Sequence, residues 1–342
     1  DVVLENTRKY LSEQATSGAT SAGNVATLNR VILPVIRRVM PTVIANELVG
    51  VQPMTGPVGQ IHTLRVRYAD ATTGGATNIA AGDEALSPFK IASSYSGNDS
   101  SPAKGSATAT LEGTAGKKLN VQILKQVVEA KSRKLSARWT FEAAQDAQAQ
   151  QGIDIEAEIM AALAQEITAE IDQEILTSLR ALAGSAAAAF DQSAVSGTAT
   201  FVGDEHAALA VLINQQANLI AQRTRRGAGN YAVVSSEALT ILQSATTSAF
   251  ARSTEGVFEA PTNTKFVGTL NNSMRVYVDG YASTGTDVLV GYKGSSEADA
   301  PAFYCPYIPL MSSGVVLDPS TFEPVVSFLT RYGYVELSNT AS

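Results

Sequence analysis

The sequence predicts an α+β fold, in which strands and helices occupy largely separate stretches of a 342-residue chain. Three observations predict it. One helix carries an isoleucine-rich stripe, two strand patterns bracket a long run of small polar residues, and strand patterns dominate from residue 274 onward. The length is enough for one large domain or two to three smaller ones.

The N-terminal part of the chain predicts an arm followed by two short helices. Residues 1–25 are polar, and the run at 15–23 is rich in Ser, Gly, Ala and Thr, which is typical of an extended arm. Apolar residues at helical spacing follow over 28–43, but Pro34 and Pro41 exclude one continuous helix, because an interior proline costs about 3 kcal/mol. The first residue is Asp rather than Met, so we expect a processing event or a further segment upstream.

A strand, a long loop and a second strand pattern come next. Leu64, Val66 and Tyr68 alternate with polar residues, which predicts a strand with one buried face. Residues 69–120 are dominated by Ala, Gly, Thr, Ser and Asp and cannot build a core of their own. With a second strand pattern at 127–139, they predict a two-stranded arm that projects from the body.

Helical patterns occupy the middle of the chain. Residues 141–151 predict a short helix that ends at Gly152, and Asp154 is placed to cap the next one. That second helix, expected to run to about Arg180, has an apolar residue every four positions: Ile155, Ile159, Leu163, Ile167, Ile171, Ile175 and Leu179. Because a spacing of four drifts against the 3.6-residue turn, this stripe winds around a long helix. A further helix is expected to start at Asp204 and to end at Gly227.

Composition narrows the functional classes. The formal net charge is -7, which does not favour nucleic-acid binding, because phosphate neutralisation needs clustered Lys and Arg. The single cysteine, Cys305, excludes an intrachain disulfide and is expected to be a small buried hydrophobe. The longest apolar region, 25–51, contains three arginines and two prolines, so no transmembrane helix and no membrane partner is expected.

Carboxylates at helical spacing are the first candidate for chemistry. Glu166, Glu170 and Glu174 lie four residues apart on one predicted helix face. A dimetal site in a helix bundle also needs His ligands at helical spacing, and the chain has only His62 and His206. A solvated or salt-bridging face is therefore the favoured interpretation.

Basic clusters are the second candidate. Arg223, Arg225 and Arg226 could hold a phosphate, but complementing the helix dipole and contacting acidic neighbours is favoured. The basic residues of 131–138 lie on a strand without the aromatic residues that stack on bases, so a solvated face is expected there. The prediction is that the chain has no catalytic, cofactor-binding or metal site, needs no cofactor, and is not an enzyme.

Three stretches of the chain resemble the major capsid proteins of T-even-type tailed bacteriophages. The first is VGVQPMTGP at 49–57, continuing to Tyr68, and the second is VLVGYKG at 288–294 with FYCPY at 303–307. The third is FEPVVSFLTRYG at 322–333. They bracket nearly the whole chain and occur in the order of that family.

The resemblance implies the Johnson fold of tailed-phage capsids and a division of the chain into its parts. These would be an N-terminal arm (1–57), an extended loop in the form of a β-ribbon (58–138), a peripheral domain with a spine helix (139–183 and 311–342) and an axial domain (184–310). The implied function is a virion subunit, assembled in the host cytoplasm into hexamers and pentamers of an icosahedral head that encloses double-stranded DNA without sequence-specific binding. Implied further partners are scaffold, maturation protease, vertex, decoration and portal proteins.

Two departures and two alternatives accompany the resemblance. T-even-type proteins carry a domain inserted near the extended loop, and the corresponding region here is too sparse in core residues for one. Lys-to-Asn cross-links, known in some shells of this fold, are not expected, although Lys90, Lys104, Lys117 and Lys118 lie in the proposed loop. An encapsulin-like compartment and another phage structural subunit, such as a sheath or baseplate protein, are the alternative functions.

Overall fold

A computed structural model describes most of the chain and divides it into two units at Arg38 and Val39. All described residues belong to the second unit: 45–72, 79–85, 95–97, 105–190, 202–244, 250–252, 265–270, 273–281 and 287–337. The expected arm and the two helices over 28–43 therefore lie outside the described residues.

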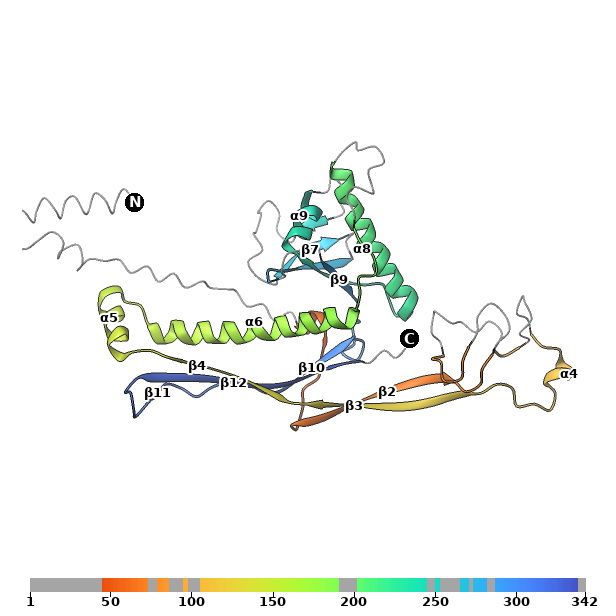
Figure 1. Ribbon diagram of the computed structural model, residues 1–342, viewed down its shortest axis with the longest axis horizontal. Coiled ribbons are helices and arrows are strands. Elements are labelled where there is room, and N and C mark those ends of the chain that lie inside the picture. Colours follow the sequence, from red (N-terminus) through yellow and green to blue (C-terminus); the bar gives the residue numbers. More distant parts are fainter. Residues whose placement is uncertain are drawn as a thin grey trace, which may run out of the picture. The chain divides into compact units, whose positions relative to one another are not determined.

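A five-stranded sheet joins the beginning, middle and end of the described chain (Figure 1). Its order is β1 (Gly50–Val51), β10 (Ala302–Ser312), β12 (Pro324–Glu336) and β11 (Val316–Leu317), and β4 (Lys131–Arg138) also pairs with β12. β1 is parallel to β10, and the other pairings are antiparallel. β10 and β12, two of the strands expected from residue 274 onward, thus form the centre of this sheet.

A separate two-stranded ribbon consists of β2 (Val58–Tyr68) and β3 (Leu119–Glu129), paired antiparallel along their whole length. The excursion between them contains the short helix α4 (Thr108–Leu111). The prediction of one strand over 127–139 is wrong, because Ala130 separates β3 from β4, and β4 pairs with β12 instead of β2. The ribbon pairing therefore ends at Glu129, short of the expected range 58–138.

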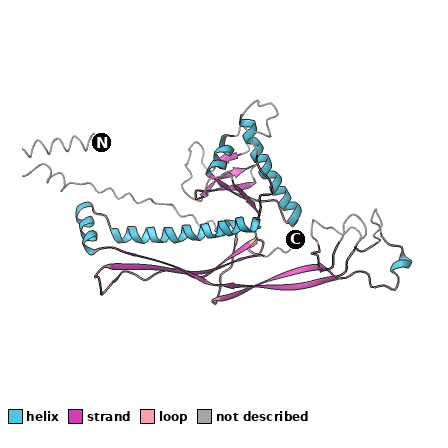
Figure 2. Ribbon diagram, in the orientation of Figure 1, coloured by secondary structure: helices cyan, strands magenta, loops and turns pink. Residues whose placement is uncertain are grey.

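The two predicted helices after β4 are confirmed (Figure 2). α5 (Phe141–Gln151) ends at Gly152, which adopts a left-handed conformation with φ of 66°. α6 (Ile155–Ala183) is capped by Asp154, the residue before its first turn. The Asp154 carboxylate accepts a hydrogen bond from the backbone N–H of Glu156. This cap satisfies one of the amides that an α-helix leaves unpaired at its start.

The apolar stripe of α6 contacts two different parts of the molecule. Near the start of the helix, Leu163 and Ile167 pack with Val326 and Phe328 of β12. Near its end, the helix contributes to a different hydrophobic cluster. That cluster consists of Ile175, Leu176, Leu179, Leu48, Val49, Tyr231, Val233, Tyr277 and Ala302. Because a four-residue spacing shifts gradually around a helix of 3.6 residues per turn, one stripe can contact β12 near the start of α6 and the second cluster near its end.

The second sheet has the order β6 (Phe250–Arg252), β7 (Lys265–Leu270), β8 (Met274–Asp279), β5 (Tyr231–Ser235) and β9 (Val288–Gly291). β5 is parallel to β8 and antiparallel to β9. All five residues of β5 are buried, as expected for a strand covered on both faces.

Two helices pack with this second sheet. α8 (Val202–Thr224) and α9 (Ser236–Ser244) contribute Leu209, Ile213 and Leu239 to a core shared with β5 and β8. The predicted start of α8 at Asp204 is wrong, because the helix begins two residues earlier. The helix ends at Thr224, before the predicted end at Gly227, and Arg225 beyond it takes the left-handed conformation, with φ of 53°.

Gly333 marks the place where β3 lies against β12. A Cβ atom at this position would lie 2.5 Å from Cγ1 of Val128 and 3.1 Å from the carbonyl oxygen of Glu129. We expect Gly333→Val to lower the free energy of unfolding by about 2 kcal/mol, because overpacking forces the backbone to shift. Gly59→Ala is the control, since its Cβ would meet Met54 at an ordinary 3.4 Å. Equal urea unfolding midpoints for the two variants would contradict this packing.

Candidate functional site

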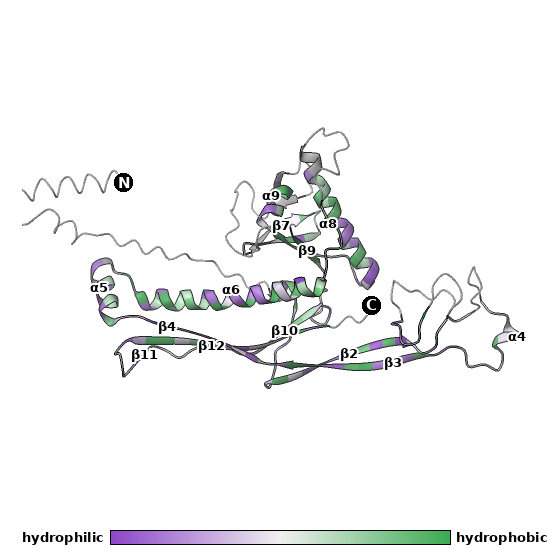
Figure 3. Ribbon diagram, viewed as in Figure 1, coloured by the Kyte–Doolittle hydropathy of each residue, from purple (hydrophilic) through white to green (hydrophobic). Residues whose placement is uncertain are grey.

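Over residues 63–66 and 121–124, one face of the ribbon of β2 and β3 is more apolar than the other. Directly paired residues project to the same face, and the pairs Leu64–Ile123 and Val66–Val121 alternate with Thr63–Leu124 and Arg65–Gln122. We call the exposed apolar row the ribbon stripe; it consists of Leu64, Leu119, Val121, Ile123 and Val127. The hydropathy colouring marks apolar segments along both strands (Figure 3).

The ribbon stripe is exposed to a degree that is unusual for apolar side chains on a strand. Ile123 is 71% exposed, Leu64 68% and Val121 64%. The expectation that Leu64 lies on a buried face is therefore wrong for the single chain, because a two-stranded ribbon has no second layer to cover it. An isolated two-stranded ribbon is marginally stable in water, and contiguous exposed apolar surface marks an interaction site.

The far end of the ribbon is held together by a small cluster of its own. The rings of Tyr68 and Tyr95 pack in a tilted arrangement with centroids 4.5 Å apart, and Ile79 and Ala85 are buried beside them. Lys117 donates a hydrogen bond of 2.7 Å from Nζ to Oγ1 of Thr72.

The four lysines considered for cross-linking fall into two groups. The ammonium group of Lys117 has the local partner Thr72, and the backbone N–H of Lys118 donates to the Asp70 carboxylate at 2.9 Å. Lys90 and Lys104 lie outside the described residues. The absence of cross-links stays a prediction.

The glutamate row of α6 forms a salt-bridging face, as predicted. Arg133 of β4 contacts Glu170 at 2.9 Å and Glu174 at 2.5 Å, and its Nε donates to the Tyr332 hydroxyl at 2.6 Å. The Tyr332 hydroxyl also donates to Glu174. Within the described part of the chain, no three His, Cys, Asp or Glu side chains are grouped as a metal ion would require.

This network sets the ionisation of Glu174. Burial acts to raise the pKa of Glu174, but hydrogen bonds from Arg133 and Tyr332 outweigh it and hold that pKa below its ordinary value of 4.5. A carboxyl group whose pKa is lower in the folded state than in the unfolded state stabilises the fold at pH values above its unfolded-state pKa. This stabilisation is lost as the pH falls through the folded-state pKa.

Acid unfolding tests this ionisation. We expect Glu174→Gln to reduce the loss of stability between about pH 5 and pH 3, by up to about 1 kcal/mol, because the carboxylate is partly exposed and screened. Glu166→Gln, at an exposed position on the same helix, is the control for replacing a glutamate of α6 by glutamine. The measurement is the free energy of unfolding against pH; identical slopes for Glu174→Gln and wild type would contradict the assignment.

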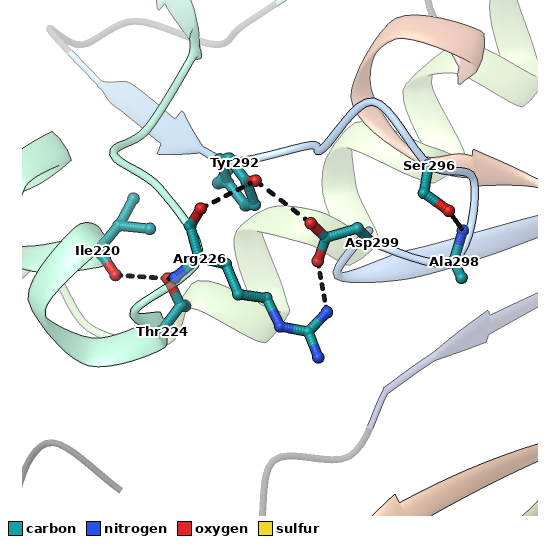
Figure 4. A network of polar contacts seen from close by, with 7 residues as sticks. All are labelled: Ile220, Thr224, Arg226, Tyr292, Ser296, Ala298 and Asp299. Atoms are coloured by element: carbon teal, nitrogen blue, oxygen red, sulfur yellow. Dashed lines mark hydrogen bonds and ion pairs between the residues drawn. The ribbon is translucent and has the colours of Figure 1, made fainter. Parts of the chain in front are cut away.

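Of the three arginines at the end of α8, Arg226 contacts an acidic neighbour, as the sequence predicts for this cluster. Nη1 of Arg226 lies 2.5 Å from Oδ1 of Asp299, and the Tyr292 hydroxyl donates to Oδ2 of Asp299 at 3.2 Å (Figure 4). Gly227 lies against the Tyr292 ring, where a Cβ atom would come within 2.8 Å of Cε2. These contacts join the end of α8 to the loop before β10, so Arg226 has a structural role.

Cys305 is a buried core residue, as expected. It is 3% exposed and packs in a cluster with Val128 and Phe303. Burial raises the pKa of its thiol. A buried thiol with a raised pKa is a poor nucleophile, because the thiolate is the reactive form.

Comparison with known proteins decides the family. The family model for "Major capsid protein Gp23" matches residues 25–342. The chain belongs to the Gp23 family of major capsid proteins. The major capsid protein of Vibrio phage KVP40 is 31% identical over 420 aligned residues, which cover 97% of this chain and 80% of the relative. That of Enterobacteria phage T6 is 31% identical over 411 residues, covering 95% and 81%.

Solved structures agree on the fold. The capsid protein of Myoviridae phage XM1 matches with a TM-score of 0.53 and 12% identity, over 95% of this chain and 97% of that chain. The predicted tailed-phage capsid fold is therefore confirmed. This major capsid protein is a structural, non-enzymatic component of the virion that assembles with copies of itself into icosahedral phage heads. The encapsulin-like and sheath or baseplate alternatives are set aside.

Two further findings bear on the sequence predictions. The alignment with the Vibrio phage relative spans 420 residues against 342 in this chain, so the relative has segments with no counterpart here. In the described part of the major capsid protein, no helix is long and apolar enough to cross a membrane.

Proposed function

We propose that this major capsid protein forms hexameric capsomers, with pentamers at the vertices unless a separate vertex protein occupies them. In each capsomer, the ribbon of one subunit lies over its neighbour, and the axial domain (184–310) meets its copies at the centre. The N-terminal arm (1–57) adds a further overlap. The extended loop (58–138) and the peripheral domain (139–183 and 311–342) form the outer part.

The ribbon stripe is the observation that carries this proposal. Its members are between 51% and 71% exposed in the single chain, and they share one face of the ribbon. Docking that face on a second subunit would remove its apolar surface from water, at about 25 cal/mol for each Å² buried. Because the same contact recurs around a closed capsomer, many modest interfaces sum to a shell that is hard to open.

The enclosed cargo is proposed to be double-stranded DNA, held without sequence-specific contacts. The net charge of -7 and the pairing of basic side chains such as Arg133 and Arg226 with carboxylates fit a wall that does not grip DNA. Scaffold, maturation protease, vertex, decoration and portal proteins are the proposed further partners. Assembly is proposed to take place in the cytoplasm of the bacterial host.

Electron microscopy of native particles, with a nuclease-protection assay on the same sample, tests the proposal. We expect closed shells built of hexamers that protect DNA from nuclease. Closed shells without nucleic acid but with a co-purifying enzyme would contradict the proposed cargo. Rods, or shells lacking six-fold capsomers, would contradict the proposed assembly.

A further inference from the structure

One pair of polar side chains interrupts the apolar ribbon stripe. His62 of β2 and Lys125 of β3 are directly paired, and the next pair on this face, toward the far end of the ribbon, is Leu64–Ile123. Side chains alternate along a strand and paired residues project to the same face, so His62 and Lys125 lie on the face of the stripe. Both side chains are exposed in the single chain. Lys125 thus lies between the stripe members Ile123 and Val127.

The ribbon supplies no anion to this pair. Within the described part of the chain, neither His62 nor Lys125 takes part in an ion pair. The one carboxylate that β2 and β3 place on this face belongs to Glu129, four residues along β3 from Lys125. Four residues of strand separate the two Cα atoms by roughly 13 Å, too far for a direct contact of side chains that stand upright on the strand.

Docking of the ribbon stripe on a neighbour would bury this pair together with the apolar side chains around it. Removing an ammonium group from water is strongly unfavourable unless an opposite charge and hydrogen bonds compensate for the lost hydration. The Lys125 ammonium has three N–H donors, and the His62 ring has at least one. A carboxylate on the docked surface can accept from both residues, which makes it the group that this pair requires.

The chain carries an excess of carboxylates that could provide this partner. It has 32 Asp and Glu against 25 Lys and Arg. The stretch 139–179, which contains α5 and most of α6, has nine Asp and Glu and no Lys, Arg or His. Four of its side chains are exposed and make no ion pair with described residues: Glu142, Asp146, Glu156 and Glu166.

The ribbon and this acidic stretch have opposite charges. β2 and β3 together carry three Lys and Arg against one Glu. Complementary charges on two different parts of one chain favour a head-to-tail contact between copies, in which one part of each subunit binds the other part of the next.

We propose that Lys125 and His62 bind one carboxylate of the stretch 139–179 in a second copy of this chain. Apolar contacts are non-directional, whereas a buried charged pair is satisfied only where its partner lies opposite. The contact therefore fixes where along its neighbour the ribbon binds. This inference rests on the proposed function, and it names the chemical group that the ribbon recognises.

Zero-length cross-linking of native particles tests the contact directly. A water-soluble carbodiimide joins an amine to a carboxylate only where the two already touch. We expect a covalent dimer whose cross-linked peptide connects Lys125 to an Asp or Glu of 139–179. A link from Lys125 to another protein or to another part of the chain would overturn the choice of partner. No link from Lys125, in particles where other lysines are joined, would overturn the contact itself.

Charge reversal gives an independent readout. Lys125→Glu places a carboxylate against the proposed carboxylate, so we expect closed shells in infected cells to fall at least about tenfold. The melting temperature of the isolated subunit should not change, because this side chain is exposed there. A Lys at the cross-linked acidic position, added to Lys125→Glu, is expected to restore shells to within about threefold of wild type. Gln122→Glu, on the other face of β3, is the control.

Comparison with a second variant separates this inference from the proposed function. Ile123→Glu tests docking of the ribbon stripe and leaves the His62–Lys125 pair intact. If Ile123→Glu loses its shells and Lys125→Glu keeps wild-type numbers, Lys125 extends past the interface into solvent, and only the carboxylate contact is overturned. Wild-type shell numbers for both variants would contradict docking of the ribbon and, with it, the proposed function.

Discussion

Ile123→Glu is expected to leave the subunit folded but to reduce the number of closed shells by at least about tenfold. Ile123 is 71% exposed in the single chain and pairs with Leu64 in the middle of the ribbon stripe. A carboxylate there costs little in the monomer. In a shell it would have to be desolvated against an apolar neighbour, which costs several kcal/mol at each copy of the contact.

Gln122→Glu is the matched control, because it places the same charge one residue away on the opposite, polar face, where Gln122 pairs with Arg65. Sedimentation and electron microscopy of particles from infected cells provide the count. Equal shell yields for the two variants would mean that the ribbon stripe is not an interface.

Arg180→Met is expected to lower the free energy of unfolding by about 3 kcal/mol. Nη2 of Arg180, in the last turn of α6, lies 3.1 Å from Oδ2 of Asp279, which is fully buried at the end of β8. Gln173 and the backbone N–H of Tyr281 still donate to the other carboxylate oxygen, at 3.1 and 3.0 Å. The variant therefore leaves a buried charge with hydrogen bonds but without its counterion.

A double variant separates the buried charge from other effects of the substitution. Asp279→Asn keeps the shape and removes the charge, so Arg180→Met with Asp279→Asn should recover most of the lost stability. Chemical denaturation of the isolated subunit measures all three variants. Strictly additive losses would contradict the coupling between α6 and the second sheet.

The sequence predicted those elements whose signals are local. Asp154 caps the start of α6 and Gly152 ends α5, and both caps depend only on residues close in sequence. Both helices were therefore predicted at their observed places. The resemblance supplied the topology, which no local pattern contains. The pairing of β4 with β12 joins Arg133 to Thr330, and residues so far apart in sequence leave no periodic signal of their contact.

The surface proposed for assembly, the ribbon stripe, was harder to predict. The alternation at Leu64 correctly predicted a strand with one apolar face, but alternation does not say whether the same chain covers that face.

A cryo-electron microscopy map of the assembled shell, at a resolution that resolves side chains, tests the central claim most directly. The account predicts that Leu64, Val121 and Ile123 pack against an adjacent subunit of the same capsomer and lose nearly all of their exposed surface. A shell in which this row of side chains faces solvent, with the ribbon held by other contacts, would contradict it.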